Sequence, residues 1–528
     1  MKKEIKKGFL IKVMAFFLVF LGTIFLGKSI QTLARSTLDP TKPISVSGGK
    51  ITGTYSGDQS VAEYKGIPYA KPPVGNLRWR APENVNPWQG IKNANKWGKS
   101  PMQKDPEPYN QWSQEFINAK TGLSENSLNL NIWANKNKIQ KKPVIVYIYG
   151  GGFNTGGSSC PVYDGKNIAK KGAIFVSINY RVGIFGFLAH PQLSQESPTK
   201  TSGNYGLMDQ IKALQWVKAN IGKFGGNSNN VTIMGQSAGA KSVNDLLISP
   251  KARGLFNKAV SLSSNYYDLK LPSLKQKEQA GTKAFKGKSL KQMRKISAKD
   301  LLKIDYDNGP NIDHNVIPGN YLDEVKARKS ADVPLMSGYV GNDIERELVS
   351  TDTEGNISKK SYEQQVRQKT GRYANTFLKA YPSNGQNTKR VANRLNMDDL
   401  LAKQNYLTQI RNKNYINRTY NYFFTHVMPG PESQKWGAFH TSDVPYFLSN
   451  FSPLRKNYWQ AGDYKLGNTM SNYLVNFVKT GNPNTFNLSR WNANNGTYKY
   501  MNLNTNSRQD RLPKNKVQLF QKLYNFHK

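Results

Sequence analysis

The 528-residue sequence contains a single cysteine, Cys160. One cysteine cannot form an intrachain disulfide, so the fold must be stable without a disulfide framework. No activating base lies near Cys160 in the sequence, so we expect a buried structural thiol and not a nucleophile. Histidine is also scarce, at five residues. This scarcity leaves few candidates for a general base that works near neutral pH.

Acidic residues are few compared with basic residues, at 34 against 75, and the formal net charge is +41. The sequence has no basic motif with interleaved aromatic residues, so no nucleic-acid partner is expected. The excess charge predicts a solvated basic surface that can associate with an anionic cell surface. A hydrophobic content of 38% predicts a folded globule. Internal repeats and low-complexity linkers are absent, so separate modules are not expected.

Residues 1–30 combine a lysine-rich start with the apolar run 13–26. This pattern is typical of a secretory signal peptide. No clear small-residue cleavage site follows it, so an N-terminal membrane anchor is the alternative. Both interpretations predict a secreted or extracellular cell-surface protein that contacts membrane only through this segment. Residues 31–528 are expected to form one catalytic domain.

Apolar runs that fit buried strands alternate with helical patterns, at 144–149, 173–179, 204–222, 231–234 and 238–248. The alternation predicts an α/β fold with a mostly parallel central sheet and helices on both faces. Two polar helical stretches, around 269–330 and 351–430, are expected to form a helical cap over this sheet. Residues 517–526 are expected to form a C-terminal docking helix.

The run 231–234 leads into Gly235-Gln236-Ser237-Ala238-Gly239. A strand that stops at Gly-x-Ser-x-Gly predicts a sharp strand-to-helix turn with the Ser237 hydroxyl exposed at its apex. An ordinary Gly/Ser turn would give the same pattern. The run 144–149 likewise ends in glycines 150–152, whose N–H groups could stabilise an oxyanion, although a flexible turn is the alternative. Both segments are expected at the ends of parallel strands where α/β proteins bind ligands.

A serine nucleophile needs a general base, and the base needs a carboxylate that orients it. Three of the five histidines follow both Ser237 and a candidate acid in the chain. His440, in a loop that contains Gly, Ser and Pro, is the best candidate base. Asp343 and Glu345 follow the strand-like run 333–339 and are the candidate acids.

The chain resembles the type-B carboxylesterases of the cholinesterase-like α/β-hydrolase family. The matching segments are GIPYAKPPVGNLRWRAP, SENSLNLNIW, YGGGF, NYRVGIFGFL, VTIMGQSAGAKSV, GAFHTSDVPYF and TGNPN. They cover most of the chain after residue 50. The resemblance implies an α/β-hydrolase fold and a serine esterase that uses an acyl-enzyme, without a metal or an organic cofactor. It also implies Ser237 as the nucleophile and His440 as the base.

The resemblance implies further roles for backbone groups and ion pairs. The implied oxyanion hole consists of the N–H groups of Gly151, Gly152 and Ala238. The implied structural pairs are Arg78 with Glu125 and Arg181 with Asp209. At the acid position the family usually has a glutamate followed by glycine, whereas this chain reads GNDIE. The spacing favours Asp343 as the acid, and Glu345 is the alternative.

Two more departures concern a cysteine and a charge. Ser127 stands where the family has a cysteine, so the early disulfide of the family is absent. Gln236 replaces the glutamate of the common GESAG motif, which removes a negative charge that would favour cationic substrates. We therefore expect neutral or anionic small-molecule esters as substrates, and not choline esters. The alternative function is a catalytically silent adhesion or binding protein, although such family members typically lack the nucleophile.

Overall fold

The computed structural model describes residues 37–136, 141–264, 270–343, 348–351, 356–431 and 433–525. The expected signal or anchor segment, 1–30, lies outside these residues. So does Glu345, the alternative acid. Among the described residues, no helix is long and apolar enough to cross a membrane.

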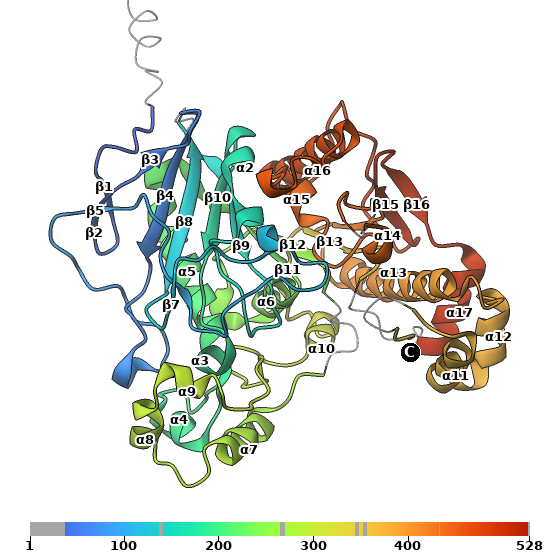
Figure 1. Ribbon diagram of the computed structural model, residues 1–528, viewed down its shortest axis with the longest axis horizontal. Helices are drawn as coiled ribbons and strands as arrows, with labels where there is room; N and C mark the ends of the chain where they lie inside the picture. Colours follow the sequence, from blue (N-terminus) through green and yellow to red (C-terminus); the bar gives the residue numbers. More distant parts are fainter. Residues whose placement is uncertain are drawn as a thin grey trace, which may run out of the picture.

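A large sheet of eleven strands runs through the molecule (Figure 1). Its order is β16-β15-β14-β13-β12-β11-β9-β10-β8-β4-β3. The strands span Thr54–Tyr55 (β3), Val61–Pro68 (β4), Asn129–Asn135 (β8), Lys142–Ile148 (β9), Ile174–Ile178 (β10), Gly226–Gln236 (β11), Lys258–Leu262 (β12), Leu335–Val340 (β13), Thr419–Phe424 (β14), Lys499–Leu503 (β15) and Arg508–Arg511 (β16). In this order, each pair of neighbours from β15 through β9 to β10 is parallel. Antiparallel strands flank this parallel part on both sides.

Helices cover both faces of this sheet. The chain runs from β9 to β10 in one direction along the sheet, then returns past β9 to β11 and continues to β12. Because such crossovers are right-handed, α2 (Lys166–Lys170) lies on the face opposite to α5 (Tyr205–Asn220) and α6 (Ala238–Ile248). The long helix α16 (Ala461–Thr480) packs on β9 and β11. The prediction of an α/β fold with a mostly parallel sheet is confirmed.

Two helical regions extend beyond the sheet, one below it in Figure 1 and one to its right. The first contains α3 (Gly183–Phe187), α4 (Pro191–Glu196), α7 (Leu274–Ala284), α8 (Leu290–Lys295) and α9 (Ala298–Leu301). The second contains α11 (Lys359–Thr370), α12 (Ala374–Ala380), α13 (Thr388–Asn414) and the C-terminal α17 (Lys514–Tyr524). Each region has its own apolar cluster, separate from the main core. Helix α10 (Tyr321–Lys326) connects the first region back to the sheet, where it packs on α6.

The second expected cap range, 351–430, ends too late. Its last part contains β14, a fully buried strand that lies between β13 and β15 in the central sheet. The sequence TYNYFF is aromatic and short, and it follows a polar helix closely, so its pattern does not separate it from the helical stretch before it.

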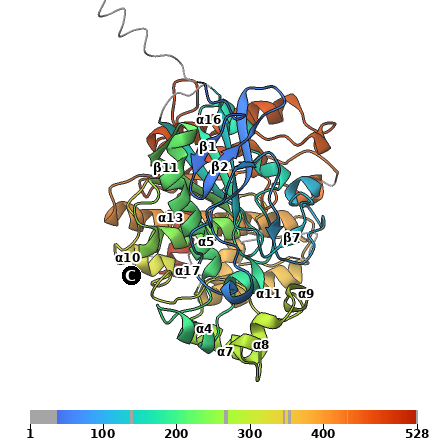
Figure 2. The ribbon, with the colours of Figure 1, turned by 90° about the vertical axis from the view of Figure 1, so that its left-hand side faces the viewer.

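Smaller strands shape the N-terminal part, which Figure 2 shows from the side. β1 (Ile44–Val46), β2 (Gly49–Thr52) and β5 (Ile91–Asn93) form a three-stranded sheet. β6 (Ser100–Pro101) pairs with β7 (Leu123–Ser124) at the base of a long loop. This loop, residues 102–122, reaches over the carboxyl ends of the central strands and contributes to the site described below.

Candidate active site

Ser237 occupies a strained turn between β11 and α6. Its φ of 57° and ψ of −126° place it in a region that residues with side chains rarely adopt. The backbone N–H of Ser237 donates to the Leu262 carbonyl at 3.0 Å, and its own carbonyl accepts from the N–H of Lys241 at 2.9 Å. The surrounding strand and helix therefore hold the turn against its strain. This geometry is the strand-to-helix turn that the Gly-x-Ser-x-Gly pattern predicts.

The glycines on either side of Ser237 are required for close packing. A Cβ atom at Gly235 would lie 2.3 Å from the carbonyl oxygen of Gly239. A Cβ atom at Gly239 would lie 2.0 Å from the carbonyl oxygen of Ile148, at the end of β9. Neither position can carry a side chain unless the backbone moves, so both glycines let α6 start directly against the sheet.

His440 and Asp343 are in direct contact, although 97 residues separate them in the chain. The Nδ1 atom of His440 lies 2.7 Å from Oδ1 of Asp343, and both residues are buried. The N–H of Val340, at the end of β13, approaches the other carboxylate oxygen at 3.4 Å. A carboxylate accepts only, so the proton between Asp343 and His440 belongs to Nδ1. The Nε2 atom of a neutral His440 is then an acceptor.

A short backbone bridge holds the two loops together. Asn342 pairs with Phe439 in a parallel β-bridge, and its N–H donates to the Ala438 carbonyl at 2.7 Å. The side-chain amide of Asn342 also donates to the Trp436 carbonyl at 2.7 Å. Asp343 and His440 each follow a residue of this bridge directly. The bridge therefore fixes the separation between the carboxylate and the imidazole.

The side chain of Gln236 contacts the opposite side of the imidazole. Its amide nitrogen Nε2 lies 3.0 Å from Nε2 of His440. Gln236 is the last residue of β11 and is buried. Within the described ranges, Ser237 Oγ has no hydrogen-bond partner. In this state the imidazole therefore contacts Gln236 on one side and Asp343 on the other.

A glycine-rich turn follows β9 beside Ser237. Gly151 and Gly152 have φ values of 112° and 62°, which favour glycine, and the Gly151 carbonyl accepts from the N–H groups of Asn154 and Thr155. Gly151, Gly152 and Ala238 all line the same cavity as Ser237. Among the described residues, their N–H groups have no backbone acceptor. They are thus available to a ligand in the cavity.

This cavity has a volume of about 890 Å³ and contains both Ser237 and His440. The loop 102–122 contributes aromatic side chains to its wall. Trp112 stands edge-on to the His440 ring with 6.4 Å between ring centroids, and its indole N–H donates to Oγ1 of Thr441. Tyr109 packs against Trp112 at 5.0 Å between ring centroids. The apolar wall shields the imidazole from water on this side.

Among the described residues, six charged side chains line the cavity, three of them basic and three acidic. They are Lys104, Lys241 and Lys277, with Asp105, Glu107 and Asp307. Lys241 stands one helical turn after Ser237 on α6. Lys277, on α7, is buried, and its ammonium group contacts Asp307 and the ring of Tyr306. Burial lowers the pKa of Lys277.

A second buried carboxyl group lies close to the imidazole and was not singled out in the sequence. Asp443 is fully buried three residues after His440, and one of its oxygens accepts from the Tyr422 hydroxyl at 2.6 Å. Burial raises the pKa of Asp443 to about 6, and the nearby Asp343 carboxylate acts in the same direction. The only sequence signal for this group is an acid placed shortly after the candidate base. Trp112 carried no comparable signal.

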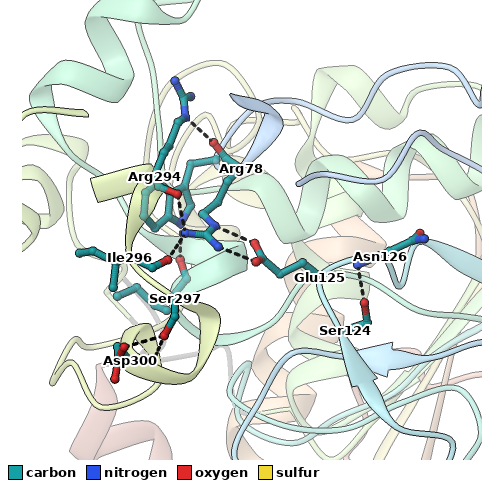
Figure 3. Close-up of polar contacts among 10 residues, drawn as sticks. Arg78, Ser124, Glu125, Asn126, Arg294, Ile296, Ser297 and Asp300 are labelled. Atoms are coloured by element: carbon teal, nitrogen blue, oxygen red, sulfur yellow. Dashed lines mark hydrogen bonds and ion pairs between the residues drawn. The ribbon is translucent and has the colours of Figure 1, made fainter. Parts of the chain in front are cut away.

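The implied structural pairs are in contact in the structure. Arg78 binds Glu125 through two hydrogen bonds, of 2.5 and 2.7 Å, and also donates to the carbonyls of Arg294 and Ile296 (Figure 3). The pair therefore joins the N-terminal region, the base of the loop 102–122 and the end of α8. Arg181 and Asp209 are both buried and form two side-chain hydrogen bonds of 2.8 Å.

Cys160 is buried beside the cavity wall, and its thiol approaches the Glu115 carbonyl at 3.3 Å. Burial raises the pKa of this thiol, so Cys160 stays protonated and is a poor nucleophile. Ser127 is also buried, at the position where the resemblance places a cysteine. Within the described part of the chain, no cluster of three or more His, Cys, Asp or Glu side chains could hold a metal ion.

Comparisons with known proteins agree with this geometry. The protein-family model for the carboxylesterase family matches residues 40–520. A fumonisin B1 esterase from Sphingopyxis macrogoltabida is 32% identical over 492 residues, which cover 89% of this chain and 87% of that protein. A cholinesterase from Mus musculus is 32% identical over 498 residues, with coverages of 84% and 80%. An acetylcholinesterase from Bungarus fasciatus is 30% identical over 474 residues, with coverages of 81% and 76%.

Proposed function

The chain belongs to the carboxylesterase family and is a carboxylic-ester hydrolase, and we propose that Ser237 performs this hydrolysis through a covalent acyl-enzyme. The proposal rests on one arrangement. Ser237 lies on a strained turn and lines the same cavity as His440, and the Nδ1 atom of His440 is paired with Asp343. A hydroxyl on such a turn becomes a nucleophile when a neutral imidazole removes its proton.

The reaction proceeds in two acyl-transfer steps. Ser237 Oγ attacks the ester carbonyl carbon while its proton passes to Nε2 of His440, and Asp343 stabilises the resulting imidazolium. His440 then gives the proton to the leaving alkoxide oxygen, and the ester C–O bond breaks. Water attacks the acyl-enzyme with His440 as the base again, which releases the acid and restores the Ser237 hydroxyl. No metal or organic cofactor takes part.

The N–H groups of Gly151, Gly152 and Ala238 form the oxyanion hole in this mechanism. Their place on the cavity wall beside Ser237 supports the role. Negative charge develops on the carbonyl oxygen in each tetrahedral intermediate, and preoriented N–H groups stabilise it without reorganisation. The loss of one such donor costs about 3 to 4 kcal/mol of barrier in a related enzyme. Backbone position therefore matters as much here as side-chain identity.

Neutral or anionic esters are the proposed substrates. The names of the relatives refer to unlike substrates, fumonisin B1 and choline esters, so the preference is argued from the cavity. Gln236 brings no negative charge to the imidazole, and the cation of Lys241 stands one helical turn from the nucleophile. Among the described residues of the cavity wall, three lysines balance the carboxylates of Asp105, Glu107 and Asp307, so a cationic choline group would meet no excess of negative charge, whereas a carboxylate on the substrate could pair with Lys241.

Hydrolysis of a short-chain p-nitrophenyl ester tests the function. The wild type should release p-nitrophenolate with an initial burst, and Ser237→Ala should lose at least about three orders of magnitude in kcat. Ser242→Ala, a change in the same helix outside the proposed machinery, is the matched control. Equal rates in the wild type and Ser237→Ala would refute the enzyme mechanism and favour the silent binding protein instead.

The charge preference is tested with two aryl esters that differ only in a terminal carboxylate on the acyl group. We expect Lys241→Met to raise KM for the carboxylate-bearing ester by about tenfold, because one charge-assisted contact is lost. The neutral ester should keep its KM. A parallel change for both esters would show that Lys241 supports the cavity and does not select for charge.

We also propose that the protein is exported and that the chain after residue 30 acts as one catalytic domain with helical insertions. The basic and apolar pattern of residues 1–30 supports export. The net charge of +41 supports association with anionic cell surfaces. N-terminal sequencing of the protein recovered outside the cell distinguishes a cleaved signal from an anchor, since an intact Met1 would rule out cleavage.

A further inference from the structure

The amide of Gln236 occupies the one atom of His440 that must accept the serine proton. Nε2 of Gln236 and Nε2 of His440 are 3.0 Å apart in a buried environment. Because Asp343 fixes the ring proton on Nδ1, Nε2 of His440 carries a lone pair and can only accept. Gln236 must therefore present its N–H group, and not its carbonyl, to the ring.

We propose that Gln236 is a positioning residue that holds the resting imidazole neutral, with its proton on Nδ1, and so keeps the esterase active at lower pH than a carboxylate at this position would allow. The inference rests on the proposed role of His440 as the base. It assigns Gln236 an action on the base, which is distinct from its effect on substrate charge.

The hydrogen bond opposes protonation for a simple reason. When the ring nitrogen gains a proton, it can no longer accept a hydrogen bond from the amide. The N–H groups of the ring and of the amide then face and repel each other. Burial of Gln236 keeps water from replacing the amide. A glutamate at residue 236 would act in the opposite direction, because a carboxylate stabilises the imidazolium.

Other charged groups around the imidazole set the balance that Gln236 adjusts. Asp343 faces Nδ1 from the loop after β13, and Asp443 lies in the loop of His440 itself. Both carboxyl groups favour the imidazolium when ionised. Lys241 on α6 lines the same cavity and disfavours it. Gln236 therefore acts in the same direction as Lys241, against the imidazolium. It acts at Nε2, the nitrogen that accepts the proton of Ser237.

Nε2 has a single lone pair in the ring plane, so its contacts with Gln236 and with Ser237 alternate. In the described structure the lone pair faces Gln236. Attack by Ser237 requires the amide to release Nε2, so the contact with Gln236 belongs to the resting enzyme.

The test is the pH dependence of kcat/KM for a neutral p-nitrophenyl ester in the full-length protein. The midpoint of the acid limb reports the protonation of the free base and does not depend on the fraction of correctly folded enzyme. We expect Gln236→Glu to raise this midpoint by about one unit or more. Gln236→Met, which removes the amide without adding charge, should raise it by about half a unit.

Gln518→Glu adds the same charge at an exposed position of α17 and is the matched control, with no expected shift. Identical midpoints in the wild type and both Gln236 variants would overturn the proposal. A shift in Gln236→Glu with none in Gln236→Met would also overturn it, because the added charge alone would explain that result. If Ser237→Ala abolishes hydrolysis while the midpoints coincide, only this inference fails and the proposed function stands.

Discussion

Replacing Asp343 by asparagine tests the geometry of the proposed triad most directly. Oδ1 of Asp343 lies 2.7 Å from Nδ1 of His440, and neither side chain is appreciably exposed. At an effective dielectric constant of about 20, a carboxylate and an imidazolium at this distance attract each other by about 6 kcal/mol. The asparagine side chain would lose this attraction, and its NH2 group can also force the ring proton onto Nε2.

Both effects reduce the rate of the chemical step and leave substrate binding intact. We expect Asp343→Asn to lower kcat by about 10³ to 10⁴, in line with the effect of this change in a serine protease triad. The loss corresponds to a barrier increase of about 4 to 5 kcal/mol. The assay is steady-state hydrolysis of a p-nitrophenyl ester at saturating substrate, with active sites counted from the initial burst.

Glu345→Gln is the matched control, because it makes the same change in the alternative acid. It should keep most of the wild-type kcat, since Nδ1 of His440 already has Asp343 as its partner. A larger loss in Glu345→Gln than in Asp343→Asn would refute the reasoning. It would mean that the contact at 2.7 Å is not the one that operates during catalysis.

Three further changes probe the scaffold. Gly239→Ala should lower kcat about 100-fold, because the new Cβ would lie 2.0 Å from a carbonyl oxygen of β9. Gly222→Ala is the control and should leave kcat unchanged, because a Cβ at that position would meet open space. Burial raises the pKa of Asp443 from 3.8 to about 6, so between these pH values the folded protein keeps a proton that the unfolded chain has lost. The free energy of unfolding therefore falls as pH rises through this range. In urea unfolding at acidic and neutral pH, Asp443→Asn should reduce the difference between the two unfolding free energies by about 3 kcal/mol. Glu125→Gln should cost about 3 kcal/mol of unfolding free energy in urea, because it leaves the buried Arg78 without its carboxylate, and an unchanged midpoint would show that the carbonyl contacts suffice.

Local patterns predicted the parts of the fold that depend on neighbours in the chain. Buried parallel strands such as β9 and β10 are continuous apolar runs, and the turn at Ser237 needs small residues at fixed positions beside it. β14 was missed, because a strand of six residues is defined by its pairing with β13 and β15 and not by its own composition. Both partners are distant in the chain, so no local window contains the pairing.

The site required information that no local pattern contains. Chain order selected His440 and two candidate acids, and the spacing favoured Asp343, but the contact of Asp343 with the imidazole depends on the bridge of Asn342 with Phe439, which forms only in the folded chain. The contact of Gln236 with the imidazole depends on the same loop placement. A substitution that sequence reasoning treats as a lost charge is, in the structure, also a gained hydrogen-bond donor.

The net charge of +41 and the charge of the cavity act at different ranges. At physiological salt the Debye length is about 8 Å, so exposed lysines attract anionic partners mainly during approach and lose this effect as salt rises. Among the described residues of the cavity wall, three lysines balance three acids, and Lys241 stands one helical turn after Ser237 on α6. A charge preference that persists at high salt would therefore arise from the lysines of the cavity, whereas one that disappears would arise from the surface, and the proposed cell-surface association would be of the second kind.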